Sequence, residues 1–219
     1  RRALLRWCLG HHNVPGMHRM AKESEAIMTC DIILCSVGGQ GGLSASIILA
    51  RATMASGFQV KQSEIHGMSQ RGGEVLAHLR IADKEIYSPT ISKGKADIMF
   101  AFEPLEALRH LSWISPSNGT IVSATTAVLN ISNYPDLEIV LAEIRKIPRA
   151  RLIDAEAIAR QAGNVRTANL VLIGAAMDLL PISPNAIEKE IIELFSKKGK
   201  SIIQANLKAF EAGRALYHG

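Results

Sequence analysis

The chain has 219 residues, of which 47% are hydrophobic and 21% charged, as expected for one globular domain with at most a small appendage. Aromatic residues make up only 5%, and most of the formal net charge of +5 lies near the amino terminus, so the composition argues against nucleic-acid binding. No apolar run approaches the ~18 residues of a membrane span.

Residues 1–27 do not resemble the remainder of the chain. They contain five basic and two acidic residues, a net charge of +3, and their Arg, His and Trp residues follow no periodic pattern. We expect an N-terminal extension outside the fold, with residues 28–219 forming the domain. Translated upstream sequence is the simplest explanation. A targeting peptide is the alternative, although its apolar part is too short for a secretory signal.

From Met28 onward the pattern alternates between strands and helices, which predicts an α/β fold. We expect a Rossmann-like, mainly parallel sheet with helices on both faces and further C-terminal helices. Ser183 and Pro184 are a typical helix start. The predicted strands are 29–37, 58–62, 74–81, 96–102, 119–123 and 150–153. The predicted helices are 43–55, 104–113, 136–147, 154–162, 165–180, 184–196 and 201–217.

Three cysteines are too few and too scattered for a disulfide framework or a metal cluster. Cys30 and Cys35 lie five residues apart in the first predicted strand, so their side chains should point to opposite faces. Cys8 lies in the N-terminal extension. The pattern predicts no metal site and favours a reducing, cytoplasmic location.

A glycine-rich turn, residues 36–42 (SVGGQGG), joins the first strand to the first helix. Its glycines permit left-handed backbone angles, and the amides of the following helix attract anions. The dinucleotide fingerprint G-x-G-x-x-G is incomplete, because Ser36 occupies its first glycine position. A dinucleotide, another phosphate-bearing ligand such as coenzyme A, and a purely structural turn are all compatible with it. The candidate ligand-binding residues are Gly38, Gly39, Gln40 and Gly41.

A second polar segment, residues 64–73 (EIHGMSQRGG), has a composition that no apolar periodicity explains. It lies about one strand–helix unit after the glycine turn, so both segments should reach the same edge of the sheet, where α/β folds bind ligands. His66 is a candidate acid, base or hydrogen-bond donor. Arg71 is a candidate clamp for a carboxylate or phosphate. The alternative is an interface loop that bonds the backbone of another chain.

Two further polar features follow predicted strands. Glu103 ends a strand before Pro104, where it either binds the same ligand or neutralises the positive end of the next helix. Asn164, Arg166 and Asn169 precede an apolar helix, and the last two share one helix face. They either contact a ligand or form a helix start and an interface. Glu103 and Asn169 are added to the candidate ligand-binding residues.

Five strings in this order resemble one family: SVGGQGG, SEIHGMSQRGGEV, ADIMFAFEPLEALR, DAEAIARQAGNVRTANLVLIGA and NLKAFEAGR. The family is the gamma-type domain of the 2-oxoacid:ferredoxin oxidoreductases, and the strings are most similar to the beta subunits of its indolepyruvate branch. The resemblance extends from Met28 to about Leu216 and implies a gamma-type catalytic domain over residues 28–219. Ser36 departs from the usual GVGGQG, which affects only how tightly the turn begins.

The resemblance implies a reaction that this chain does not complete alone. Such enzymes decarboxylate a 2-oxo acid, here an aryl pyruvate such as indolepyruvate, pass two electrons to ferredoxin and form an acyl-CoA. They need thiamine diphosphate, [4Fe–4S] clusters and coenzyme A. The chain lacks cysteine quartets for clusters and a Gly-Asp-Gly…Asn-Asn thiamine motif. The resemblance therefore implies a large alpha subunit that carries both cofactors, with ferredoxin reached through the complex.

Within such a complex the resemblance implies half of an active site. His66, Gln70 and Arg71 would lie near the thiamine-bearing subunit and position the substrate carboxylate or the acyl intermediate. The glycine turn would hold coenzyme A or the backbone of the partner. Two alternatives are a stand-alone NAD(P)-binding Rossmann dehydrogenase and a non-catalytic scaffold subunit.

Overall fold

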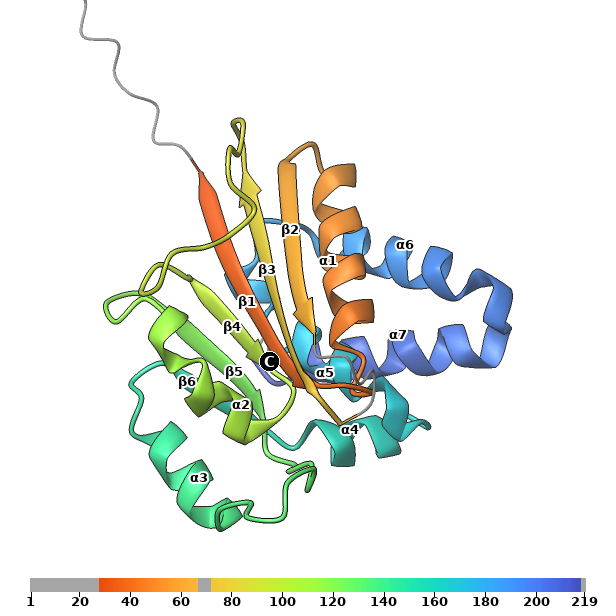
Figure 1. Ribbon diagram of the computed structural model, residues 1–219. Coiled ribbons are helices and arrows are strands. Elements are labelled where there is room, and N and C mark those ends of the chain that lie inside the picture. Colours follow the sequence, from red (N-terminus) through yellow and green to blue (C-terminus); the bar gives the residue numbers. More distant parts are fainter. Residues whose placement is uncertain (1–27, 67–71, 218–219) are drawn as a thin grey trace, which may run out of the picture.

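The computed structural model describes residues 28–66 and 72–217 (Figure 1). The strands of its sheet are β1 (Thr29–Val37), β2 (Gln59–His66), β3 (Glu74–Ala82), β4 (Ile98–Ala101), β5 (Thr120–Ala124) and β6 (Ala150–Ile153). Their order is β2-β3-β1-β4-β5-β6. β1, β4, β5 and β6 are parallel, whereas β3 is antiparallel to both β1 and β2. The predicted mainly parallel sheet is confirmed, with one antiparallel strand inserted beside β1.

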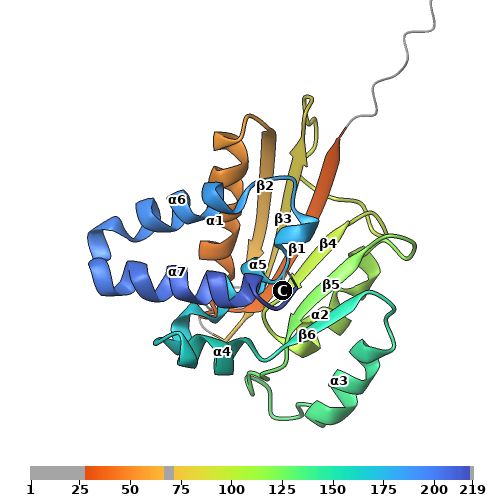
Figure 2. The ribbon, with the colours of Figure 1, turned by 180° about the vertical axis from the view of Figure 1, so that it is seen from behind.

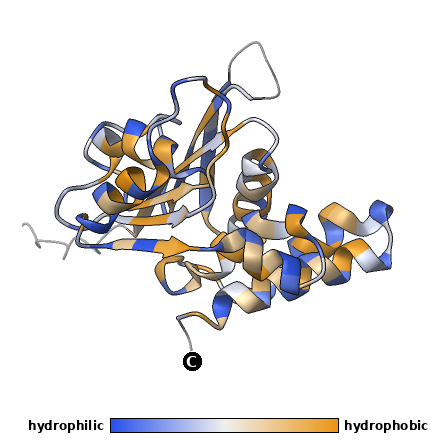
Figure 3. Ribbon diagram, turned by 90° about the horizontal axis from the view of Figure 1, so that it is seen from below, coloured by the Kyte–Doolittle hydropathy of each residue, from blue (hydrophilic) through white to orange (hydrophobic). Residues whose placement is uncertain are grey.

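Helices cover both faces of this sheet (Figures 1 and 2). They are α1 (Gly42–Ala55), α2 (Pro104–Arg109), α3 (Leu137–Arg145), α4 (Ala155–Gln161), α5 (Ala168–Gly174), α6 (Pro184–Phe195) and α7 (Lys200–Arg214). α2 and α3 enclose one core, and α1 with α4 to α7 encloses the other. Hydrophobic and hydrophilic residues alternate along α6 and α7, which project beyond the sheet (Figure 3). In the described ranges, no helix combines the length and apolarity that a bilayer span requires.

β1 separates the two cores, which explains its continuous apolar sequence. Ile32 and Leu34 belong to the core under α1, and Ile33 and Cys35 belong to the core under α2. Because side chains alternate along a strand, a centre strand with helices on both faces needs apolar residues at every position. Cys30 lies in the first core, so the prediction that Cys30 and Cys35 face opposite sides is confirmed.

Both described cysteines should be chemically inert in the folded protein. Burial raises the pKa of Cys30 to about 12, with a smaller contribution from Asp97 and Asp31. Burial, and then the charge of Glu106, raises the pKa of Cys35 well above its ordinary value. Because the thiolate is the reactive form, we expect neither to react with iodoacetamide at pH 8 until guanidinium unfolds the chain. Peptide mass mapping before and after unfolding checks this, and rapid labelling of either native thiol would contradict it.

The polar segment 64–73 begins inside a strand, which corrects the predicted strand end at residue 62. β2 continues to His66, and its last residues pair in register with β3, Glu64 opposite Ala77 and His66 opposite Val75. β2 lies at the edge of the sheet, where backbone pairing with one neighbour suffices and polar side chains are tolerated. Composition alone therefore placed the strand end too early.

Two predicted helices are divided in the structure. The segment 104–113 forms α2 and then a 3-10 turn at Leu111–Trp113. The segment 165–180 forms a 3-10 turn, then α5, then a second 3-10 turn at Met177–Leu179. The carbonyl of Ala175 accepts a hydrogen bond from Arg151 Nη1 (2.8 Å) instead of continuing the helix. This long-range partner is not visible in the local pattern.

The predicted start of the helix at Pro184 is correct. Pro184 occupies the first turn of α6, and Ser183 occupies the N-cap position. The Ser183 side chain makes no capping hydrogen bond, and its backbone carbonyl instead accepts from Ala186 N (3.1 Å). The proline, with its restricted φ, therefore carries the helix-start signal.

Candidate functional site

Within the glycine-rich segment 36–42, residues 38–41 connect the end of β1 to the start of α1, and the name glycine turn is used below for these four residues. Gly39 and Gly41 have φ values of 108° and 83°, in the left-handed region that favours glycine. Gln40 holds the turn in place, since its Oε1 accepts from Val37 N (2.8 Å) and its Nε2 donates to Phe102 O (2.7 Å). The Gln40 amide is thus engaged by the main chain, and the groups that the turn offers to a ligand are mainly backbone groups.

The end of the second polar segment lies against the glycine turn. Gly38 N donates to Gly73 O (2.8 Å), and Gly72 N donates to Gly38 O (3.2 Å). Asn130 Nδ2 also donates to Gly72 O (2.9 Å), which adds the loop after β5 to the same edge. The prediction that the two glycine-bearing segments reach one edge of the sheet is confirmed.

A first cavity of about 390 Å³ lies between the glycine turn and the end of β2. Glu64 and His66 line it together, because residues two apart in a strand share a face. Leu43, in the first turn of α1, forms part of the opposite wall and is 48% exposed. Gln70 and Arg71 lie outside the described residues, so their position near this cavity stays a prediction.

A second cavity of about 310 Å³ lies beyond the same turn and is lined by Gly39, Gln40, Gly41, Arg166 and Asn169, among others. Asn169 Nδ2 donates to Gly41 O (3.1 Å) and so links α5 to the turn. Asn169 is only 5% exposed, and its Oδ1 is buried without a hydrogen-bond partner. An unpaired buried acceptor costs about 1–3 kcal/mol.

Asn164 has a local structural role at the start of the segment that carries Arg166 and Asn169. Its Oδ1 accepts from Arg166 N (3.0 Å), which caps the 3-10 turn Val165–Thr167. Arg166 is exposed and lines the second cavity together with Asn169, although it lies in the 3-10 turn and not in α5. Asn164 therefore has the helix-start role, whereas Arg166 and Asn169 are placed where they can contact a ligand in the second cavity.

Glu103 is an internal cap rather than an open ligand-binding group. It is 1% exposed, and its Oε2 accepts from Glu106 N (2.9 Å) at the start of α2. Its Oε1 accepts from Val128 N (3.4 Å) and from the hydroxyl of Tyr134. Burial, together with this bond to Glu103, raises the pKa of Tyr134. Of its two predicted roles, the structure favours helix capping, and Glu103 fixes the loop after β5.

Several cavity residues were not among the sequence-based candidates. Ser36 and Leu43 flank the glycine turn, and Glu64 belongs to the second segment. Thr126 follows β5 and lines the second cavity. The rule that ligands bind at the carboxyl ends of parallel strands would have found Thr126. Nothing in the local sequence distinguishes Leu43 from a core residue.

Residues 31–216 match the family model described as pyruvate ferredoxin/flavodoxin oxidoreductase. The chain belongs to this family. Indolepyruvate oxidoreductase subunit IorB of Archaeoglobus fulgidus is 37% identical over 194 residues, which cover 85% of this chain and 94% of that protein. The resemblance of the five sequence strings is thereby confirmed, and the chain is a subunit of a 2-oxoacid:ferredoxin oxidoreductase.

Two solved oxidoreductases share the fold of this chain. Subunit PORC of pyruvate oxidoreductase from Thermotoga maritima has a TM-score of 0.64 and 25% identity, and the match covers 85% of this chain and 96% of that one. The 2-oxoglutarate:ferredoxin oxidoreductase of Magnetococcus marinus has a TM-score of 0.69 and 23% identity, over 86% of this chain and 31% of that one. Membership of this family leaves the stand-alone dehydrogenase without support.

Proposed function

We propose that this subunit completes the active site and the coenzyme A region of an enzyme that oxidises an aryl pyruvate such as indolepyruvate. The products are an acyl-CoA, CO2 and reduced ferredoxin. The 37% identity to an indolepyruvate oxidoreductase subunit supports this substrate class. The complex would lie in the cytoplasm, since Cys30 and Cys35 are free thiols.

The observation that carries the coenzyme A assignment is that one glycine turn forms a wall of two cavities. Gly39 and Gly41 line both the 390 Å³ and the 310 Å³ cavity. Coenzyme A is long and carries phosphates at one end, so it suits a path over backbone amides at a helix start with room on either side. The Magnetococcus marinus enzyme that shares this fold was solved with coenzyme A and succinyl-CoA bound.

The cofactors of the reaction would be held by a large alpha subunit. In residues 28–66 and 72–217 the cysteines are Cys30 and Cys35, which are buried on opposite faces of β1, so these residues do not fit a cluster that needs four thiolates. Thiamine diphosphate in the partner would supply the carbanion chemistry of decarboxylation. The present chain would contribute His66, Gln70 and Arg71, which bind and orient the carboxylate or acyl group beside it.

A scaffold role without ligand contact is the second candidate. It is favoured by Gln40 and Glu103, whose side chains are engaged within the chain. The side chains of Glu64 and His66 at the first cavity, and of Arg166 at the second, favour ligand contact instead. Kinetics with coenzyme A distinguish the two roles.

Leu43→Glu in the assembled complex tests the proposed function. Leu43 is 48% exposed at the first cavity, so a carboxylate there should repel the phosphates of coenzyme A without disturbing the core. We expect KM for coenzyme A to rise about tenfold, which corresponds to about 1.4 kcal/mol. Steady-state kinetics at varied coenzyme A measure this.

Met54→Glu is the matched control, because Met54 is 63% exposed on the same helix and lies outside both cavities. It should leave KM for coenzyme A unchanged. Gel filtration establishes that each variant complex is assembled. An assembled Leu43→Glu complex with wild-type KM would contradict the coenzyme A assignment. Loss of assembly in this variant alone would support the scaffold role.

A further inference from the structure

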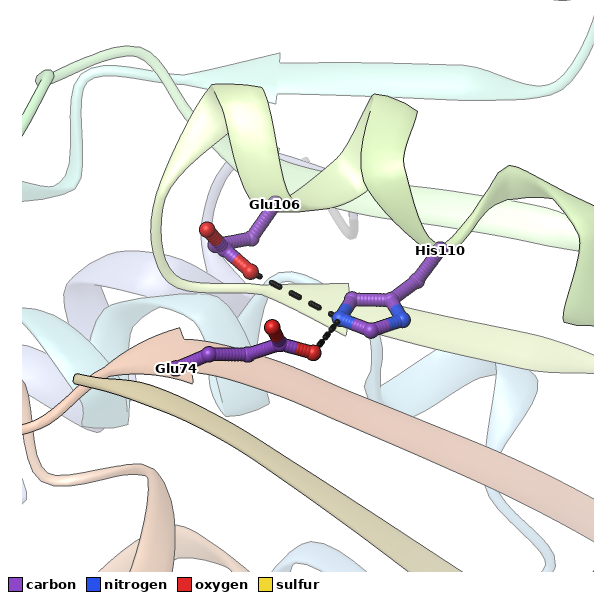
Figure 4. Close-up of side chains that lie close together, drawn as sticks. All are labelled: Glu74, Glu106 and His110. Carbon is purple, nitrogen blue, oxygen red and sulfur yellow. Dashed lines mark ion pairs between the residues drawn. The ribbon is translucent and has the colours of Figure 1, made fainter. Parts of the chain in front are cut away.

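Three potential metal ligands meet on the α2 side of the sheet, away from both cavities (Figure 4). Glu106 and His110 lie one helical turn apart at α2, and β3 brings Glu74 to them from a distant part of the chain. His110 Nε2 is 3.0 Å from Glu74 Oε1 and 3.5 Å from Glu106 Oε2. Imidazole and carboxylate groups are common ligands of divalent transition metals.

Two of these ligand atoms are buried without a hydrogen-bond partner. Glu106 is 2% exposed and His110 is 6% exposed. Glu106 Oε2 and His110 Nε2 make no hydrogen bond, although the distances between imidazole and carboxylates are short. Ligands of one ion direct their lone pairs at a common centre and not at each other. The two close contacts of the imidazole are ion-pair distances (Figure 4), and an ion bound between the three groups would give the buried Oε2 and Nε2 the partner that they lack.

We propose that Glu74, Glu106 and His110 form a binding site for a divalent transition-metal ion, with Zn²⁺ the favoured occupant. Zn–N and Zn–O bonds of about 2.0–2.2 Å place tetrahedral ligands about 3.3–3.6 Å apart. The ligand atoms of the three residues all lie within 4.8 Å of one another, and two of the separations are 3.0 and 3.5 Å. Glu74, whose side chain is 44% exposed, leaves access for the ion and for water as a fourth ligand.

The local charge favours binding of a dication. Glu74, Glu103 and Glu106 all lie close enough to Cys35 for their charges to raise the pKa of its thiol, after the larger effect of burial. Arg109 supplies one positive charge, with Nη1 3.5 Å from Glu74 Oε2 and 3.3 Å from Glu106 Oε1. Three carboxylates and one guanidinium have a formal charge of −2. A dication cancels this charge.

The ion would have a structural role that reaches the glycine turn. Glu74 directly follows Gly73, whose carbonyl accepts from Gly38 N. An ion bound to Glu74 and α2 would therefore hold the end of the second polar segment in place. The metal-site proposal is argued from Glu74, Glu106 and His110 alone and does not depend on the proposed function.

Isothermal titration of the chelator-treated full-length chain with Zn²⁺ tests the inference. His110→Asn, Glu106→Gln and Glu74→Gln should each weaken one binding event at least about tenfold, as loss of a ligand requires. Glu143→Gln, an exposed carboxylate on α3, is the matched control and should bind like the wild type. The chain has seven histidines, so only the binding event lost in all three variants belongs to this site.

Arg109→Met tests the charge argument. Removing the guanidinium should tighten Zn²⁺ binding about three- to tenfold, since a competing positive charge is lost. Far-UV circular dichroism establishes that the variants are folded, and the exposed position of Glu74 makes Glu74→Gln the mildest of them. If wild type and a folded Glu74→Gln bind Zn²⁺ with equal affinity and stoichiometry, or if Arg109→Met does not tighten binding, the inference is wrong.

Discussion

Gly213→Ala should lower the free energy of unfolding by about 3 kcal/mol or more, the upper part of the range for overpacked cores. A Cβ at Gly213 would lie 2.1 Å from Val171 O, and one at Gly174 would lie 2.1 Å from Phe210 O. These are backbone atoms, so no side chain can rotate away and α5 must separate from α7. Val171 and Phe210 are fully buried at this contact, so separation also opens the core. The better helix propensity of alanine, about 1 kcal/mol, offsets part of this loss.

Urea denaturation of the purified chain, followed by circular dichroism, measures the effect of Gly213→Ala. Lys208→Ala, at an exposed position of α7, is the control and should remain within about 0.5 kcal/mol of the wild type. Gly174→Ala should reproduce the loss from the opposite helix. Wild-type stability of both glycine variants would show that α5 and α7 do not approach as closely as described.

Arg71→Ala should lower kcat/KM for the 2-oxo acid about 10- to 150-fold in the assembled complex. A hydrogen-bonded ion pair between a guanidinium and a substrate carboxylate contributes about 1.5–3 kcal/mol, and each 1.4 kcal/mol is a factor of ten. Arg71 lies outside the described residues, so this expectation rests on its place in the segment that begins with Glu64 and His66 at the first cavity. Steady-state kinetics with indolepyruvate and with phenylpyruvate measure it.

Arg71→Lys is the informative companion, because lysine keeps the charge but loses the planar pair of donors. It should recover only part of the lost kcat/KM. His66→Ala should act mainly on kcat if the imidazole handles a proton. Unchanged kinetics for Arg71→Ala and His66→Ala, in complexes that assemble normally, would favour the scaffold role.

Much of the fold could be predicted from local pattern. The strands 29–37 and 150–153 were found to the residue. For 29–37 the reason is its apolar run, which ends at glycines and is typical of a buried strand. The end of β2 was missed, since Glu64 and His66 belong to an edge strand that needs no apolar face. The 165–180 segment was read as one helix, and the bond from Arg151 to Ala175 that divides it joins residues far apart in the sequence.

The candidate site was predictable in outline and not in detail. The glycine turn and the second segment were correctly brought to one edge, whereas the bond from Asn169 to Gly41 was found only in the structure. The role of Glu103 could not be assigned from the sequence, because its carboxylate accepts hydrogen bonds both from nearby Glu106 and from the distant Val128 and Tyr134. The roles of Gln70 and Arg71 stay predictions from the sequence, because both residues lie outside the described ranges.

The sequence predicts no metal site, and the site proposed at Glu74, Glu106 and His110 depends on contacts that the sequence does not reveal. By itself the sequence determined the family, the α/β class and the two glycine-bearing segments, since these are written in contiguous motifs and short-range periodicity. The antiparallel direction of β3, the internal partners of Gln40 and Glu103, and the meeting of Glu74 with Glu106 and His110 were decided only by the tertiary structure. Each depends on strand order and helix docking, which bring together side chains that no local pattern connects.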